Sequence, residues 1–277
     1  MSHADQEAGN GCEGVPGNLA GAGPVSADVR RGGRLTGPIG NRHARLRLRD
    51  KWLAYLACLL ESATVRMAAE RVTVAPSTSF RWRHRFIAGV RRQRRPTMSG
   101  IVEADETYLL ESQKGSRHLT RPARRRGGKA GRRGLSREFD CILVARDRNR
   151  VTHDFVTGRG PVSAAQVTPH LLPVLRPDIL LISDAAKAYQ AFAREAGITH
   201  EAVNVRAGIR ARGAIHLQNV NGWHSRFKGW LHRFHGVASR YLANYTGWRR
   251  ALDAGSPASP SDWLRIGVAP ARYGTGR

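Results

Sequence analysis

Acidic residues are scarce in this chain. It has 21 Asp and Glu against 46 Lys and Arg in 277 residues, which gives a formal net charge of +25. An excess of this size is more than solubility requires, and it indicates a polyanionic partner. Nucleic acid is the natural candidate, because neutralising phosphates releases counterions and gives strong binding that does not depend on sequence.

Cysteines and long apolar runs are also few. Cys12, Cys58 and Cys141 are scattered singly, which excludes a disulfide framework and a zinc ribbon. No apolar run approaches the length of a membrane span, and no signal peptide or basic amphipathic anchor is recognisable. We therefore expect a reduced, cytoplasmic, nucleoid-associated protein with no membrane partner.

Both ends of the chain lack a hydrophobic period. Residues 1–45 are rich in Gly, Ala, Ser and Asn, and residues 255–277 are rich in Pro, Ser and Gly. Segments that cannot bury apolar surface remain without a fixed fold. The sequence predicts a disordered tail over 1–45 and a flexible tail over 255–277.

Residues 46–97 have helical periodicity. Apolar residues recur at helical spacing from Trp52, which predicts helices over 51–61 and 64–72. Pro76 then interrupts the chain, Ser77 suits an N-cap, and a third helix is expected over 78–90. Two short helices followed by a basic third one favour a helix-turn-helix DNA-binding domain, with these residues of the third helix on its outside: Arg81, Arg83, Arg85. The alternative is a three-helix cap with a solvated arginine face.

Residues 98–254 alternate between strand and helix patterns. Strands are expected over 100–110, 139–146 and 151–156, and the first three form an antiparallel meander. The apolar run 178–183 is typical of a buried parallel strand, and a last strand is expected over 200–205. Helices are expected over 163–175, 185–196, 218–234 and 239–252. This order predicts an α/β fold with a mixed sheet and flanking helices.

A basic insertion, 111–137, separates the first two strands. Residues 114–137 contain ten Lys or Arg, five Gly and no acid, so they cannot form a packed element. We expect the insertion to follow the DNA backbone, with contacts from Arg124, Arg125, Arg126, Arg132 and Arg133.

Two carboxylates are candidates for a metal site. Asp105 lies in the first strand, and Asp184 follows the buried strand that should run beside it. Asn221 and Lys228 are seven residues apart on the helix 218–234, so they share a face. Two Mg²⁺ ions held by Asp105, Asp184 and the Asn221 oxygen would suit phosphoryl transfer, with Lys228 on a phosphate. The alternatives are that Asp184 caps the next helix, that Glu103 takes the role of Asp105, and that Asn221 is merely solvated.

The helix 218–234 and its surroundings lack acids altogether. No Asp or Glu occurs between Glu201 and Asp253, and four histidines and several aromatic residues are interleaved with arginines. The histidines could include a ligand, but a basic face in contact with phosphate is the preferred interpretation. The residues concerned are Arg226, Arg233, His216, His224, His232 and His235.

Several strings in this order resemble bacterial insertion-sequence transposases of the ISXO-like branch. They are VEADETYLLESQKGSR, RPARRRGGKAGRRGLS, LVARDR, ISDAAKAYQAFAREAGITH and HLQNVNGWHSRFKGWLHRFHGVASRYLANYTGWRRALD, preceded by RDKWL and STSFRWRHRF. The resemblance covers about residues 46–253. It implies an RNase H-like fold, two divalent ions (Mg²⁺ or Mn²⁺), and cleavage and joining at terminal inverted repeats. The branch has an Asp-Asp-Asn-Lys signature in place of Asp-Asp-Glu, and its members here are Asp105, Asp184, Asn221 and Lys228. Joining two double-stranded DNA ends implies a homodimer or higher assembly.

The chain also departs from the resemblance. Relatives of this kind usually have a Cys-rich zinc ribbon before the helix-turn-helix, whereas residues 1–44 contain only Cys12, and Ala185 stands where Gly is common after the second Asp. A catalytically inactive remnant that only binds DNA therefore remains the alternative. An RNase H-like ribonuclease shares the fold but has no use for a helix-turn-helix.

Overall fold

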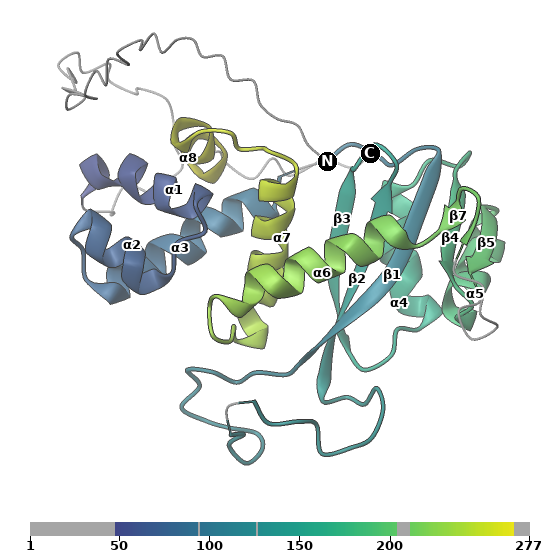
Figure 1. Cartoon of the computed structure of the whole chain (residues 1–277), viewed down its shortest axis with the longest axis horizontal. Helices are drawn as coiled ribbons and strands as arrows, with labels where there is room; N and C mark the ends of the chain where they lie inside the picture. The colour runs from purple at the N-terminus through teal and green to yellow at the C-terminus, as the bar shows by residue number, and fades with distance from the viewer. Residues whose placement is uncertain (1–47, 94, 126, 204–210, 269–277) are drawn as a thin grey trace, which may run out of the picture. The chain divides into compact units, whose positions relative to one another are not determined.

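The computed structural model describes residues 48–93, 95–125, 127–203 and 211–268, which belong to one compact unit (Figure 1). The tail expected over 1–45 and Arg126 lie outside these residues. None of the described helices is long and apolar enough to cross a membrane.

A five-stranded sheet organises the fold, with the order β3-β2-β1-β4-β5. β1 (Ile101–Leu110), β2 (Phe139–Asp147) and β3 (Thr152–Arg159) form the antiparallel meander that the sequence predicts. β4 (Leu180–Asp184) pairs in parallel with β1 and with β5 (Thr199–Val203). The predicted α/β fold with a mixed sheet and flanking helices is confirmed. A small hairpin, β6 (Ala211–Arg212) with β7 (Ile215–His216), precedes α6.

Helices cover both faces of the sheet. α4 (Ala164–Leu171), the 3₁₀ turn η2 (Leu172–Val174) and α5 (Lys187–Ala196) pack on the face that includes Val102, Ala104 and Leu181. On the other face, α6 (Gln218–His232) crosses β1 and β2 (Figure 1). Because side chains alternate along a strand, the odd-numbered residues of β1 face α6 and the even-numbered ones face α5.

The N-terminal helices form close to where the sequence places them. A 3₁₀ turn, η1 (Arg49–Lys51), leads into α1 (Trp52–Leu60), and α2 (Val65–Val72) is capped by Thr64. α3 (Pro76–Arg91) begins two residues earlier than predicted, and its N-cap is Ala75, so Ser77 as N-cap is wrong. The reason is that Pro is well suited to the first helical position, where its missing N–H costs nothing.

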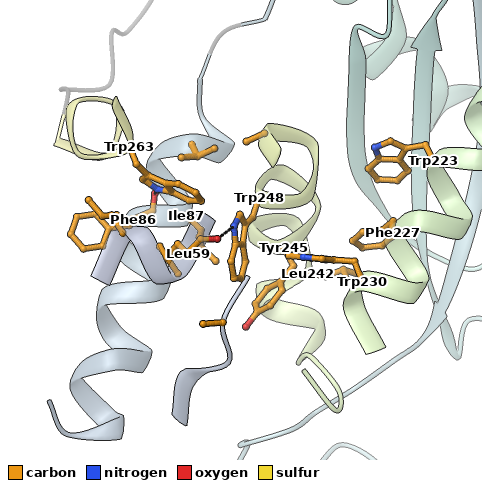
Figure 2. Packing of buried hydrophobic residues seen from close by; sticks show 14 of the residues in the cluster. Leu59, Phe86, Ile87, Trp223, Phe227, Trp230, Leu242, Tyr245, Trp248 and Trp263 are labelled. Carbon is orange, nitrogen blue, oxygen red and sulfur yellow. Dashed lines mark hydrogen bonds between the residues drawn. The ribbon is translucent and has the colours of Figure 1, made fainter. Parts of the chain in front are cut away.

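These helices do not have a separate core. One buried cluster includes Leu59 of α1, Phe86 of α3, Trp230 of α6 and Trp248 of α7 (Leu242–Asp253). Figure 2 shows these side chains packed together, with the Trp248 Nε1–H donating to the Leu59 carbonyl at 3.2 Å. The domain boundary expected near residue 97 is therefore not a break in the packing.

The flexible tail expected from residue 255 is wrong over 260–268. α8 (Pro260–Val268) follows the 3₁₀ turn η4 (Ser239–Tyr241) and α7 in the chain, and its Trp263 is fully buried against Phe86 and Trp248 (Figure 2). Gly89 of α3 and Gly267 of α8 are so close that a side-chain carbon on Gly89 would lie 2.7 Å from the Gly267 Cα. A single Trp in a Pro- and Ser-rich stretch supplies enough apolar surface to hold this short helix.

Trp263→Ala is expected to lower the free energy of unfolding by about 3–5 kcal/mol, because it leaves a cavity in a shared core. Urea denaturation measures this change. Leu172→Ala, at a half-exposed position on η2, is the matched control and should cost less than about 1 kcal/mol. Equal stability of the two variants would show that α8 does not dock as described.

Candidate functional site

Asp105 and Asp184 come together through strand register. β1 and β4 pair in parallel with Ile101 opposite Leu180, Val102 opposite Leu181 and Glu103 opposite Ile182. Continuing this register by two residues sets Asp105 beside Asp184, on the same face of the sheet as Glu103. The two predicted carboxylates therefore occupy neighbouring strands, at the end where β4 stops.

Glu103 anchors the helix that covers this site. Its buried carboxylate accepts hydrogen bonds from the backbone N–H of Asn219 (2.8 Å) and of Val220 (3.0 Å), and from the Asn219 amide nitrogen (2.7 Å). Leu217, the N-cap of α6, offers no side-chain cap, so a strand residue far away in sequence fills that place. Arg148 pairs with the same carboxylate at 2.9 Å. Glu103 therefore holds the start of α6 in place, and its carboxylate is not available to take the role predicted for Asp105.

The face of α6 that carries Asn221 and Lys228 turns toward Asp105. His224 lies between them on this face, and its Nδ1 is 3.7 Å from Oδ2 of Asp105. Lys228 is near enough to act electrostatically on both Asp105 and His224. The Asn221 side chain is exposed and has no hydrogen bond to any described residue, so its amide oxygen is available to a ligand.

The carboxylates repel one another in a poorly solvated setting. Burial raises the pKa of Asp105 to about 7, the neighbouring Glu106 and Asp184 carboxylates act in the same direction, and Lys228 opposes them. Glu106 points to the opposite face, where burial raises its pKa and the Tyr189 hydroxyl donates to it at 2.5 Å. Three carboxylates with little solvent around them create a local demand for positive charge.

Asp184 also has a local role. Its Oδ1 accepts a hydrogen bond from the backbone N–H of Ala186 at 3.0 Å, immediately before α5. The alternative that Asp184 is the N-cap of α5 is wrong, because the N-cap is Ala186 and Asp184 only accepts from its N–H in the turn before the helix. One carboxylate oxygen is used in the turn, and the other has no hydrogen bond to the described residues.

His224 does not fit the expected phosphate-contacting face. Burial, together with Lys228, lowers its pKa to about 4, so the imidazole is neutral at physiological pH. The helix spacing of His224, three residues after Asn221 and four before Lys228, was the signal that could have placed it in the site. Trp223, Phe227 and Trp230 of the same helix are buried in the core instead.

The predicted DNA-binding arginines of α3 divide into two groups. Arg81 and Arg85 are exposed, as expected. Arg83 is wrong as a DNA contact, since it is 1% exposed, donates to the Ala63 carbonyl, and lies over the Phe234 and Trp248 rings. Spacing of 3.6 residues per turn puts Arg83 on the inner face, and the aromatic rings make that burial tolerable.

The basic insertion forms no helix or strand over its described residues, 111–125 and 127–137, yet it is fixed at its base by carboxylates. Arg124 donates to the Glu111 carbonyl (2.8 Å) and to Glu138 (2.9 Å), and Arg121 pairs with Glu111 (2.7 Å). The Arg124 side chain is therefore paired within the protein and is not free to contact DNA. The backbone N–H groups of Arg132 and Gly131 lower the pKa of Glu138 to about 2.

Of the arginines predicted to contact DNA from the insertion, Arg125, Arg132 and Arg133 are exposed. On α6 and at its end, Arg226 and Arg233 are also exposed, and Arg226 lies 3.4 Å from Asp253. These side chains, unlike Arg83 and Arg124, can reach a bound polyanion.

The described residues contain no group of three or more His, Cys, Asp and Glu placed to hold a metal ion. The donors that do converge are oxygens of Asp105 and Asp184, with the Asn221 amide on the facing helix. Hard oxygen donors of this kind, two of them anionic, fit Mg²⁺ or Mn²⁺, which retain several waters and need few protein ligands.

The chain matches the model of one known protein family. The family model described as the ISXO2-like transposase domain matches residues 97–248, more than half of the chain. No curated protein matches the chain significantly.

The similarity of this chain to solved structures is weaker than its match to the family model. They include a pre-cleavage Mos1 transpososome, at 16% identity over 79% of each chain with a TM-score of 0.29. A mariner Mos1 paired end complex with Mg has 16% identity over 79% of this chain and 78% of that chain, with a TM-score of 0.27. Scores this low carry no argument about the site.

Asp105→Asn is expected to stabilise the protein in EDTA, and more so at pH 8 than at pH 5. The folded protein holds the proton of Asp105 up to about pH 7, whereas the unfolded chain loses it near the ordinary aspartate pKa of 3.8. The contribution of Asp105 is therefore fully present below pH 3.8 and is lost as the pH rises through 7. Thermal unfolding should show a gain that grows by on the order of 1–3 kcal/mol between these pH values. Asp178→Asn, on an exposed loop, should show no such trend.

Glu103→Ala is expected to destabilise the fold by about 3–5 kcal/mol, because it leaves Arg148 and two helix N–H groups without their buried partner. Hydrogen exchange should accelerate at the amides of Asn219 and Val220. Glu70→Ala, at an exposed position of α2, serves as the control. Unchanged exchange at the start of α6 would refute the anchoring role of Glu103.

Proposed function

Since the chain belongs to the ISXO2-like transposase domain family, we propose that it is a DNA transposase with an Asp-Asp-Asn cleavage site. In this proposal Asp105, Asp184 and Asn221 form the site, and Lys228 lies beside it. The reaction is metal-dependent hydrolysis at a terminal inverted repeat, followed by attack of the freed 3′-hydroxyl on target DNA.

One observation carries the proposal: the α6 face that bears Asn221 and Lys228 turns toward Asp105. The contact between His224 and Asp105 fixes which way that face points, and the β1–β4 register adds Asp184. Together these two observations support a site formed by residues of β1, β4 and α6 near the end of β4.

The donor set fits two Mg²⁺ or Mn²⁺ ions, held by Asp105, Asp184 and Asn221. Bound there, the ions would supply charge stabilisation of the attacking and leaving oxygens in phosphoryl transfer. Lys228 is a point charge suited to a phosphate of the bound strand. The neutral imidazole of His224 lies against Asp105, and Glu103 fixes the helix that carries all three of the α6 residues.

DNA binding is assigned to the exposed arginines. Arg81 and Arg85 lie on the outer face of α3, which is the recognition helix if α1–α3 act as a helix-turn-helix. Arg125, Arg132, Arg133, Arg226 and Arg233 add phosphate contacts from the insertion and from α6. The partners are then two transposon ends and a target, which require at least a homodimer in the DNA complex. A cytoplasmic, nucleoid-associated location accords with this role.

Asp184→Asn is expected to abolish nicking of a duplex that carries the terminal inverted repeat flanking this gene. The assay uses Mg²⁺ or Mn²⁺ and follows strand cleavage on a gel. The loss should be at least about 100-fold, because the substitution removes charge at the reacting phosphate. Asn can still accept the hydrogen bond from the Ala186 N–H, so the turn before α5 is retained.

Asp178→Asn, six residues earlier and exposed, is the control and should cleave as the wild type does. DNA affinity should be unchanged in both variants. Tight binding without nicking by the wild type, with either metal, would favour the alternative that the chain is a DNA-binding remnant without catalysis.

A further inference from the structure

A cavity lies away from the candidate site residues. It has a volume of about 640 Å³ and is lined by residues of α2, α3, the base of the insertion, and the segment from the end of α6 to η4. This size falls within the range of about 300–1,000 Å³ that holds small ligands. None of the candidate site residues Asp105, Asp184, Asn221 and Lys228 lines it.

Aromatic rings form one wall of this cavity. Phe80 of α3 is 38% exposed, and its ring centroid is 4.5 Å from that of His84, one helical turn later. His84 in turn stacks on Tyr241, with 3.9 Å between centroids and 27° between ring planes. Phe80 also meets Tyr241 edge to face, with 5.6 Å between centroids, and its exposed part can contact another flat ring.

The imidazole of His84 has polar atoms without hydrogen-bond partners among the described residues. Both of its ring nitrogens are buried and have no hydrogen-bond partner among the described residues. Burial lowers its pKa to about 4, with Arg83 and Arg240 acting in the same direction, so the ring is neutral.

The cavity is surrounded by cations. No Asp or Glu lines it, whereas Arg66, Lys114, Arg233 and Arg240 do. Arg66 and Arg233 are exposed and have no carboxylate partner in the described part of the chain. Lys114 donates to the carbonyls of His235 (3.1 Å) and Gly236 (3.0 Å), which ties the insertion to this wall. Flat apolar rings under a cationic rim match a nucleotide: rings for the base and cations for the phosphate.

The cavity lies beyond the end of the helix that carries Lys228. Arg233 is the first residue after α6, and a rise of about 1.5 Å per residue puts it about 7.5 Å beyond Lys228 along the helix axis, on another side of the helix. Bases in a paired duplex show only their edges, so only an unstacked base can lie on these rings.

We propose that this cavity binds an unpaired nucleotide of the DNA strand, with its base stacked on Phe80 and its phosphate held by Arg66 and Arg233. The inference rests on the proposed function for its choice of DNA as the ligand. It adds a binding site for single-stranded DNA that is separate from the candidate cleavage site.

The test compares two DNAs by fluorescence anisotropy, with the full chain in EDTA at one fixed salt concentration. One is a blunt duplex, and the other is the same duplex with a single-stranded extension of a few nucleotides. The wild type should bind the extended DNA on the order of 10-fold more tightly. Phe80→Ala should reduce this preference to less than about twofold while leaving the affinity for blunt duplex within about twofold of the wild type.

Two further variants serve as controls for the Phe80→Ala result. Phe80→Trp should restore the preference, since any flat ring can stack, and Leu53→Ala, at an exposed apolar position of α1 outside the cavity, should not change it. A preference that survives Phe80→Ala, one that is absent in the wild type, or an equal loss for both DNAs would overturn the proposal. EDTA prevents metal-dependent cleavage, so this assay measures DNA binding alone. A protein that fails to cleave DNA can still show the preference for the extended DNA, which distinguishes failure of the proposed activity from failure of this proposal.

Discussion

The candidate site depends on one buried carboxylate at the beginning of one helix. Glu103 accepts the N–H groups of Asn219 and Val220, and α6 has no cap of its own. A negative charge at a helix N-terminus is stabilised by the unpaired N–H groups and by the helix dipole. Because the contact joins β1 to α6, it sets both the position and the rotation of the helix. Asn221 is the next residue after Val220, His224 and Lys228 follow about one and two helical turns later, and all three share the face turned toward Asp105.

The same helix connects the site with the rest of the molecule. Its opposite face carries Trp223, Phe227 and Trp230, which are buried in the cluster that also contains residues of α1, α3, α7 and α8 (Figure 2). α6 thus has two distinct faces: one carries the candidate site residues toward the carboxylates, and the other carries aromatic residues toward the core. The aromatic packing fixes the helix along its length, and Glu103 fixes its end. A site built between two such constraints has little freedom to change its geometry.

Positive charge is used in two ways in this protein. Some arginines stabilise the fold: Arg83 lies among aromatic rings, and Arg121 and Arg124 converge on Glu111 and Glu138. The others, such as Arg81, Arg133 and Arg233, remain exposed. An arginine inside the protein needs a carbonyl, a ring or a carboxylate beside it, and these partners come from distant segments. Composition therefore indicates a polyanionic partner, but it does not tell which arginines meet it.

The sequence by itself determined the order of the five strands of the main sheet and of most helices, the mixed sheet, and the place of Asp105 and Asp184 at neighbouring strands, since these follow from local periodicity and from the pairing of parallel strands. It also determined that Asn221 and Lys228 share a face, which is a matter of helical pitch. Only the tertiary structure decided that Glu103 caps α6, that His224 is buried against Asp105, that Arg83 faces inward, and that Trp263 holds α8 in place. Each of these depends on contacts between residues far apart in the chain, and local patterns carry no information about such partners.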